Sequence, residues 1–201
     1  NCPKHLGGIL TIKVAQLVFF YRCFFTKNYA KIPEGAVIFL DNNNNIIFIS
    51  CHFLTNLADA QDYVFKKVSS LYISGGSFLF YSCLFHSNLA KRGTGAALSL
   101  TDCFNIKLQF CKFIGNRGPY LGSVDITDSQ KITILLSLFL QNRAKRMGGS
   151  LYISCGWGPR LSGQITIKTS TFKMNKVNDG NGGAIYVKYC RVFHGYNISL
   201  D

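Results

Sequence analysis

The tetrapeptide Phe-x-x-Asn recurs six times along the 201-residue chain. Successive copies are 26 to 33 residues apart, and they begin at Phe25, Phe53, Phe85, Phe113, Phe139 and Phe172. The asparagines of these copies are Asn28, Asn56, Asn88, Asn116, Asn142 and Asn175. A period of about 20 to 50 residues is typical of repeat proteins, in which each repeat packs mainly against its neighbours. The motif therefore predicts a stack of similar units.

Each repeat contains two segments with the pattern of a strand. An alternating apolar segment precedes each motif, as in residues 78–83, and a Gly-led segment of small and apolar residues follows most of the asparagines, as in residues 183–188. The second unit departs, because residues 62–65 (Asp-Tyr-Val-Phe) stand where the others have glycine. Each unit is predicted to be a strand, a Phe-x-x-Asn corner, a polar loop, a Gly-led strand and a turn.

Short strands at this period predict an all-β fold, a parallel β-helix of about six to seven coils. A unit of two or three strands cannot bury its apolar face alone, whereas stacked units bury a continuous core. A propeller blade needs about 40 residues, and these units are shorter. We expect one β-helix domain over residues 1–201 without an internal boundary. Neither end of the sequence resembles a polar cap, so we expect a segment of a longer array or stacking between chains.

Equivalent residues of successive coils should stack about 4.8 Å apart. The position two before each motif phenylalanine is Cys23, Cys51, Cys83, Cys111, Ser137 and Ser170 down the stack. Alternation of side chains places this column inside, with the phenylalanines, and the thiols are expected to act as small apolar groups. A linear column does not converge as zinc ligands do, so no metal or other cofactor is expected. The motif asparagines are expected to form a ladder at a corner.

The other four cysteines are Cys2, Cys103, Cys155 and Cys190. The last three each follow a Gly-led strand at a turn. A disulfide among them is possible in an oxidising compartment, and the cysteines alone leave the compartment open.

Acidic and histidine side chains do not form a recognisable catalytic set. Glycoside hydrolysis needs two carboxylates facing each other across the substrate. Aligning the Gly-led segments places Leu98 and Tyr152 beside Asp125, the acid that lies on such a strand, and the four histidines are scattered in register. No enzymatic activity is predicted for this stretch.

Basic residues are concentrated in the loops that follow the motif asparagines. The formal net charge is +13, and these loops hold Lys31, Lys91, Arg92, Arg117, Arg143, Lys145, Arg146 and Lys176. Stacking would align the loops into a basic ridge suited to an anionic glycan or an acidic protein, unless the charges only solvate the loops. No aromatic residues interleave with the ridge, so nucleic acid is not expected.

Two tetrapeptides carry a family likeness. Gly182–Ile185 (Gly-Gly-Ala-Ile) and Phe172–Asn175 (Phe-Lys-Met-Asn) resemble the repeats of chlamydial polymorphic outer membrane proteins and, more widely, the right-handed β-helix repeats of microbial surface proteins. The resemblance implies a right-handed helix and a non-enzymatic structural or adhesive protein, a rigid stalk or filament at the cell surface or outside the cell. Two alternatives stay open: a carbohydrate-active β-helix with catalytic residues outside this stretch, and an intracellular scaffold.

Two local features bear on location. Asn197-Ile-Ser199 is an Asn-x-Ser sequon, a weak indication of secretion and N-glycosylation. The longest apolar run, near residues 14–25, is interrupted by polar residues and is shorter than the roughly 20 residues of a spanning helix.

Overall fold

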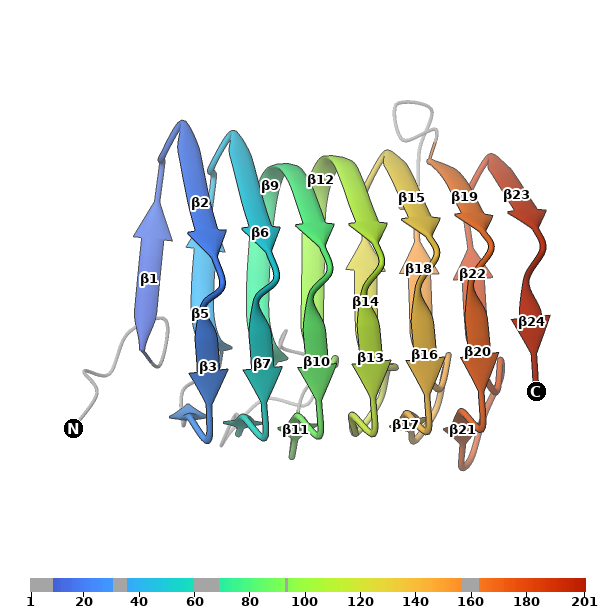
Figure 1. Cartoon of the computed structure of the whole chain (residues 1–201). Coiled ribbons are helices and arrows are strands. Elements are labelled where there is room, and N and C mark those ends of the chain that lie inside the picture. Colours follow the sequence, from blue (N-terminus) through green and yellow to red (C-terminus); the bar gives the residue numbers. More distant parts are fainter. Residues whose placement is uncertain (1–8, 31–35, 60–68, 93, 157–162) are drawn as a thin grey trace.

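The structure, a computed structural model, describes residues 9–30, 36–59, 69–92, 94–156 and 163–201. In this part of the chain the regular elements are strands, and neighbouring strands pair in parallel (Figure 1). The strands stack into columns, so that each coil of the chain lies on the previous one. The predicted parallel β-helix is confirmed.

The first column holds one strand from each of seven coils. It consists of β1 (Leu10–Lys13), β5 (Ala36–Asp41), the first halves of β9 (Ser69–Tyr81) and β12 (Leu98–Gln109), then β14 (Val124–Thr127), β18 (Leu151–Ser154) and β22 (Ile185–Lys188). The second column consists of β2 (Leu17–Tyr21), β6 (Asn45–Ile49), the second halves of β9 and β12, β15 (Lys131–Leu135), β19 (Gln164–Lys168) and β23 (Val192–Tyr196).

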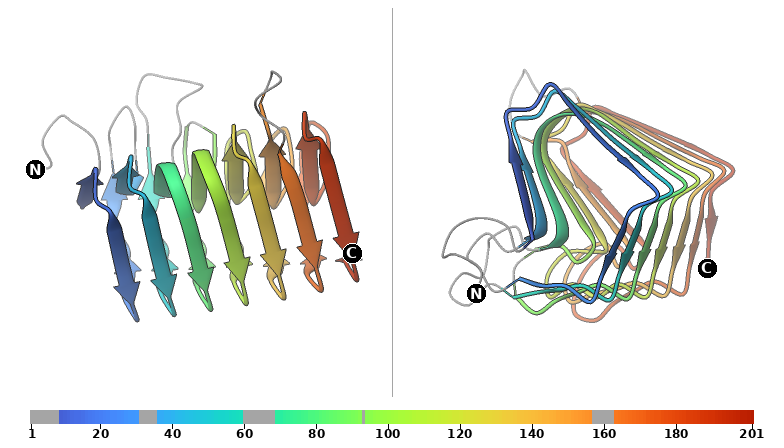
Figure 2. Two further views of the ribbon diagram at one scale, coloured as in Figure 1. Left: turned by 90° about the horizontal axis from the view of Figure 1, so that it is seen from above. Right: turned by 60° about the vertical axis from the view of Figure 1, so that its left-hand side comes forward.

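Two further columns complete each coil. The third column is β3 (Phe24–Thr26), β7 (His52–Leu54), β10 (Leu84–His86), β13 (Lys112–Ile114), β16 (Leu138–Leu140), β20 (Thr171–Lys173) and β24 (Ser199–Leu200). Two-residue strands form a short fourth column: β4 (Tyr29–Ala30), β8 (Leu57–Ala58), β11 (Leu89–Ala90), β17 (Arg143–Ala144) and β21 (Lys176–Val177). Viewed partly along the stack, the coils superimpose as one repeated outline (Figure 2).

Left-handed residues turn the chain at the corners of each coil. Between the second and third columns, the residues with positive φ are Arg22, Ser50, Ser82, Phe110, Leu136, Thr169 and Asn197. A left-handed non-glycine residue costs about 1–2 kcal/mol, so its recurrence at one position shows that the stack requires this bend.

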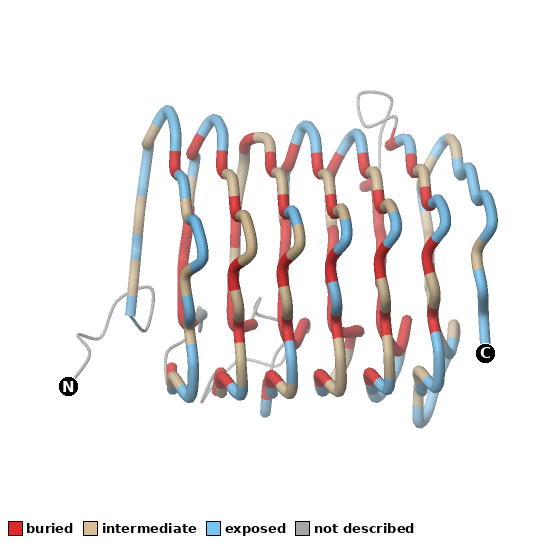
Figure 3. Tube along the Cα trace, in the orientation of Figure 1, coloured by how far each residue is buried: buried red, intermediate tan, exposed pale blue. Residues whose placement is uncertain are grey.

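The core lies inside the stack and is formed by the inward residue of each strand. Phe53, Phe85, Phe113, Phe139 and Phe172 are fully buried, and their ring centroids are 4.5–4.9 Å apart from coil to coil. Phe25 in the first coil is only partly buried. Buried segments are concentrated in the middle coils of the stack, and the first and last coils are more exposed (Figure 3). Offset stacking of rings at this separation is favourable beyond the area that it buries.

One detail of the predicted unit is wrong. The motif phenylalanine is the middle residue of a third-column strand, not part of a corner, because the bend falls at the positive-φ residue directly before the asparagine, such as Lys27 or Thr55. In coil 3 the strand of the first column begins at Ser69, after the 62–65 segment, which lies outside the described residues.

A search of the described residues finds no helix that is long and apolar enough to cross a membrane.

Candidate functional site

The asparagine ladder fixes the corner from which the basic loops begin. The side-chain carbonyl of Asn116 accepts hydrogen bonds from the backbone N–H and the side-chain amide of Asn88, both at 2.9 Å. The Asn116 amide donates to the Phe85 carbonyl at 2.9 Å and to the Asn142 carbonyl at 3.0 Å. The same pattern runs from Asn28 to Asn175 at 2.8–3.1 Å. Each loop therefore leaves the core from a defined point.

The cysteine and serine column lies at the corner between the second and third columns. The Cys51, Cys83 and Cys111 thiols are buried and donate to the carbonyl two residues earlier at 3.4–3.5 Å. Ser137 and Ser170 make the same bond at 2.8 and 3.0 Å. Cys23, in the first coil, is partly buried. Cysteine and serine therefore occupy this corner position in the same way, because each donates a hydrogen bond to the backbone carbonyl two residues earlier.

Thiol proximity within this column opposes ionisation. The hydrogen bond between the Cys83 and Cys111 thiols, followed by burial, raises the pKa of Cys83 to about 12. The pKa of Cys51 is also raised, first by its hydrogen bond with the Cys83 thiol and then by burial. Thiols that stay protonated are poor nucleophiles, so Cys51 and Cys83 are not suited to nucleophilic chemistry.

We expect alkaline pH to destabilise the protein through this column. The ordinary pKa of the Cys83 thiol is 9.0 and its folded value is about 12, so the unfolded state releases its proton first. The free energy of unfolding should therefore be intact below pH 9 and fall as pH rises from 9 to about 12. Urea midpoints at pH 8 and pH 10.5 measure the decrease.

Serine variants test whether ionisation of these thiols causes the loss of stability at alkaline pH. Cys51→Ser combined with Cys83→Ser keeps a donor that the column already accepts, and should make the decrease between the two pH values smaller. The assignment is wrong if the double variant loses as much stability between those pH values as the parent protein.

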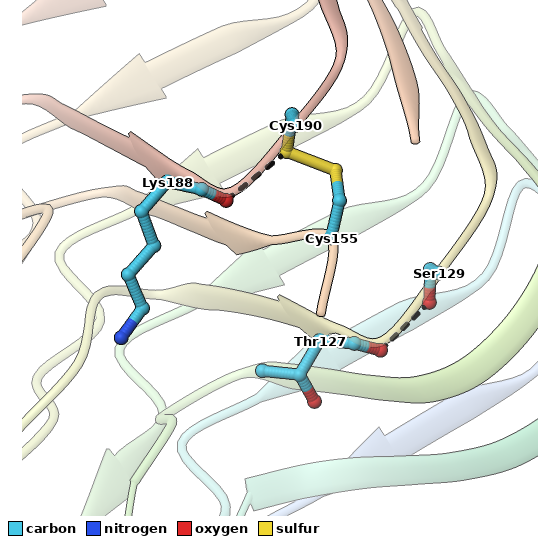
Figure 4. The surroundings of a disulfide bond; sticks show 5 residues. All are labelled: Thr127, Ser129, Cys155, Lys188 and Cys190. Carbon is cyan, nitrogen blue, oxygen red and sulfur yellow. Dashed lines mark hydrogen bonds between the residues drawn. A yellow bond between two sulfur atoms is a disulfide. The ribbon is translucent and has the colours of Figure 1, made fainter. Parts of the chain in front are cut away.

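A disulfide joins the last two coils. Cys155 and Cys190 are bonded, with a Cα–Cα distance of 4.9 Å, and the Cys190 sulfur lies 3.3 Å from the Lys188 carbonyl (Figure 4). This is one of the pairings that the sequence left open. Cys103 and Ser129 lie at the same corner in coils 4 and 5, where the Ser129 hydroxyl accepts from the Cys103 N–H at 3.1 Å. Cys2 is outside the described residues.

Asp125 lies on β14 of the first column and is fully buried. Its neighbours in adjacent coils are Ser99 and Tyr152, so the predicted neighbour Leu98 is wrong by one residue. The Thr94 hydroxyl donates to its carboxylate at 3.1 Å. No second carboxylate lies beside it on either neighbouring strand. Among the described residues, no group of three His, Cys, Asp or Glu side chains could hold a metal ion.

Three cationic residues from consecutive coils lie one above the other where the strands of the fourth column begin. Parallel bridges pair Arg117 with Arg143, and Arg143 pairs with Lys176 across β17 and β21. We call these three residues the basic column. All three are exposed, and neighbouring strands lie about 4.8 Å apart. The exposed Lys145 and Arg146 follow in the same loop, with the Arg146 guanidinium 5.3 Å from the Tyr120 ring centroid.

The remaining basic residues of the predicted ridge differ from this column. Lys91 and Arg92 lie in the corresponding loop of coil 3, but their side chains are 4.0 and 3.8 Å from the Asp59 carboxylate. Part of their charge is therefore neutralised locally. Lys31 is outside the described residues.

The sequence pattern did not reveal a groove on the outer face of the second column. Its volume is about 630 Å³, and Leu17, Asn45, Ile47, Ser77 and Leu79 are among its lining residues. Coil 4 has Phe104 as an extra residue between Cys103 and Asn105, whereas coil 3 passes directly from Gly76 to Ser77. A Cβ on Gly76 would overlap the Asn43 carbonyl oxygen, so coil 3 makes this close approach only with glycine. This difference in turn length falls beside Ser77 and Asn105, which both line the groove, and it is the local signal that the sequence offers.

Asn197 of the sequon is exposed at the left-handed corner before β24, with φ 49°.

No curated protein and no solved structure matches the chain. A family model described as "Right handed beta helix region" matches residues 6–139, two thirds of the chain. This agrees with the stacked parallel columns, and the chain therefore belongs to the right-handed β-helix family.

Proposed function

We propose that this chain is a non-enzymatic structural module of a cell surface or extracellular protein, and that its basic column binds anionic polysaccharide. The stacked columns support a rigid, extended body. The likeness of its repeats to those of the chlamydial polymorphic outer membrane proteins supports an adhesive role. The edge strands β1 and β24 offer positions for further coils of the same chain or of another copy.

The basic column is the observation that carries the binding proposal. Arg117, Arg143 and Lys176 project from consecutive coils, so their charges form a line parallel to the stack. A linear polyanion has its charges in a line as well, and can meet all three cations at once. Within the described part of the chain, no ion pair joins these three cations to a carboxylate, so the polymer need not displace one from these residues.

Location and the absence of catalysis have separate support. Disulfides form and persist in oxidising compartments, and Cys155–Cys190 favours secretion over the intracellular scaffold. Glycosylation of the exposed Asn197 belongs to the same proposal. Buried Asp125, with Ser99 and Tyr152 on either side, is not placed to share a substrate with a second carboxylate.

Binding of heparin, a sulfated polysaccharide, tests this function. We expect the parent protein to bind with an affinity that falls as salt is added, and not to bind neutral dextran. Replacing Arg117, Arg143 and Lys176 by Gln should weaken heparin binding about tenfold or more, because each exposed ion pair contributes up to about 1 kcal/mol. Titration calorimetry at two salt concentrations measures both effects.

A control triple variant removes the same charge elsewhere. Lys112, Lys131 and Lys168 are exposed on the second and third columns, and their replacement by Gln should change heparin affinity less than threefold. Equal losses in the two triple variants would show that net charge alone attracts the polymer. No heparin binding by the parent protein would overturn the proposed function.

A further inference from the structure

The outer face of the second column is uncharged in the first three coils. Its outward residues read Leu-x-Phe-x-Tyr in β2, Asn-x-Ile-x-Ile in β6 and Ser-x-Leu-x-Tyr over residues 77–81 of β9. We call these nine positions the uncharged face. In coils 4 to 6 the same positions include Lys107, Lys131 and Lys168. All nine positions of this face are thus uncharged in a chain of net charge +13, and cations lie at its border, where Lys107 lines the groove and the Arg22 guanidinium is 5.0 Å from the Tyr21 ring centroid.

Large apolar side chains on this face are open to solvent. Leu17 is 62% exposed, Phe19 55%, Tyr21 51% and Tyr81 39%. Ile47 and Leu79 are partly exposed and line the groove of about 630 Å³. A contiguous exposed apolar area rimmed by polar residues is typical of a protein interaction surface.

We propose that the uncharged face packs against the same face of a second copy of this chain, with the two stacks antiparallel. The proposal goes beyond the polysaccharide site, which lies on a different column. A second copy presents rows of side chains with the same spacing of about 4.8 Å between coils, so the rows of the two faces can interdigitate along their whole length. None of the nine positions carries a charge, so pairing the two faces buries no unpaired charge from within them.

The groove fits this arrangement. If the two-fold axis passes through Ile47 in coil 2, coil 1 of one copy lies over coil 3 of the other. The exposed ring of Phe19 then lies over Leu79 and Ser77 of the other copy, and these residues line the groove. The ring fills a depression that a flat sheet would not provide.

The available area is sufficient for a weak dimer. An aromatic side chain has about 200 Å² to bury, so Phe19, Tyr21 and Tyr81 together offer about 300 Å² at their observed exposures. Leu17 and the partly exposed aliphatic residues bring the face to about 500–600 Å² per copy. The smallest specific interfaces bury about 600 Å² per partner, so we expect a micromolar dissociation constant.

Charge selects the antiparallel orientation. The cations at these positions, Lys107, Lys131 and Lys168, are in coils 4 to 6, as is the basic column. A parallel pair would hold the two sets of cations side by side, and like charges repel across an interface. Overlap of coils 1 to 3 in the antiparallel pair leaves the two cationic ends pointing away from each other.

Sedimentation velocity between about 1 and 100 μM tests the dimer. We expect the 22.4 kDa chain to shift to twice that mass with increasing concentration. Ile47→Lys with Leu79→Lys should keep it monomeric, raising the dissociation constant at least about 100-fold because the interface would bury unpaired charges. Lysine should be tolerated there by the fold, since Lys107 occupies the same row in coil 4.

The control carries the same two charges in the same row outside the uncharged face. Thr133→Lys with Thr166→Lys, in coils 5 and 6, should dimerise within about threefold of the parent protein. Circular dichroism verifies that both variants fold. A parent protein that is monomeric at every concentration would overturn the proposal, and so would a dimer that survives the first pair of substitutions.

Photo-crosslinking tests the orientation. A benzoylphenylalanine at position 47 lies at the proposed axis and should crosslink to residues of β6 in the other copy. Crosslinks from position 47 to β15 or β19 of the other copy would contradict an axis through coil 2.

Discussion

Asn116→Ala should lower the free energy of unfolding by about 4 to 6 kcal/mol, the largest effect that we expect of any single substitution here. The change removes the acceptor of the Asn88 backbone N–H and side-chain amide, and the donor to the Phe85 carbonyl. Asn88 and Asn116 are fully buried, so water cannot replace these partners. Each buried group left unpaired costs about 1–3 kcal/mol. Urea unfolding followed by circular dichroism measures the loss.

The control for this variant is Asn178→Ala, the same change at an exposed loop position. Surface substitutions usually change stability by less than about 0.5 kcal/mol. If both variants unfold at the same urea concentration, the asparagine ladder does not hold the coils together.

Phe113→Ala should cost about 3–5 kcal/mol, the range measured for deletion of a buried aromatic side chain. Phe113 is fully buried between Phe85 and Phe139, with ring centroids at 4.7 and 4.9 Å. Its removal leaves a cavity in the middle of the column, and the backbone cannot close it because both neighbouring coils are fixed by ladder hydrogen bonds. Thermal unfolding of the variant should begin at a markedly lower temperature.

Phe104→Ala provides the comparison. Phe104 is 60% exposed on the bulge of β12, so the same truncation there leaves no cavity. If Phe113→Ala and Phe104→Ala unfold at the same temperature, the stacked phenylalanines are not the main source of stability.

The repeat predicted the architecture because each of its signals is local. Phenylalanine and the residue two before it recur at one place in every unit, so stacking any unit on the next aligns them. Cys51, Cys83, Cys111 and the motif phenylalanines therefore lie inside together. The third-column strand was missed because three residues around each phenylalanine are too few to show alternation.

Features that depend on the register between neighbouring coils could not be predicted as accurately from the sequence. The Gly-led segments aligned Asp125 with Leu98, but the backbone pairs it with Ser99, because the number of residues between glycine and strand differs by one between coils. Cys155 directly follows β18 and Cys190 is the second residue after β22, so equal spacing would not have paired them. The ion pairs of Lys91 and Arg92 with Asp59 join loops of different coils, which no local pattern contains.

The proposed function requires that stacking align loops far apart in sequence into one line of charge, and that this line bind a polyanion. Chemical footprinting of lysine and arginine side chains with and without heparin tests it most directly. We predict that Arg117, Arg143 and Lys176 become protected together over one range of heparin concentration, while Lys112, Lys131 and Lys168 stay reactive. Protection spread evenly over all six side chains, or protection that omits the first three, would contradict it.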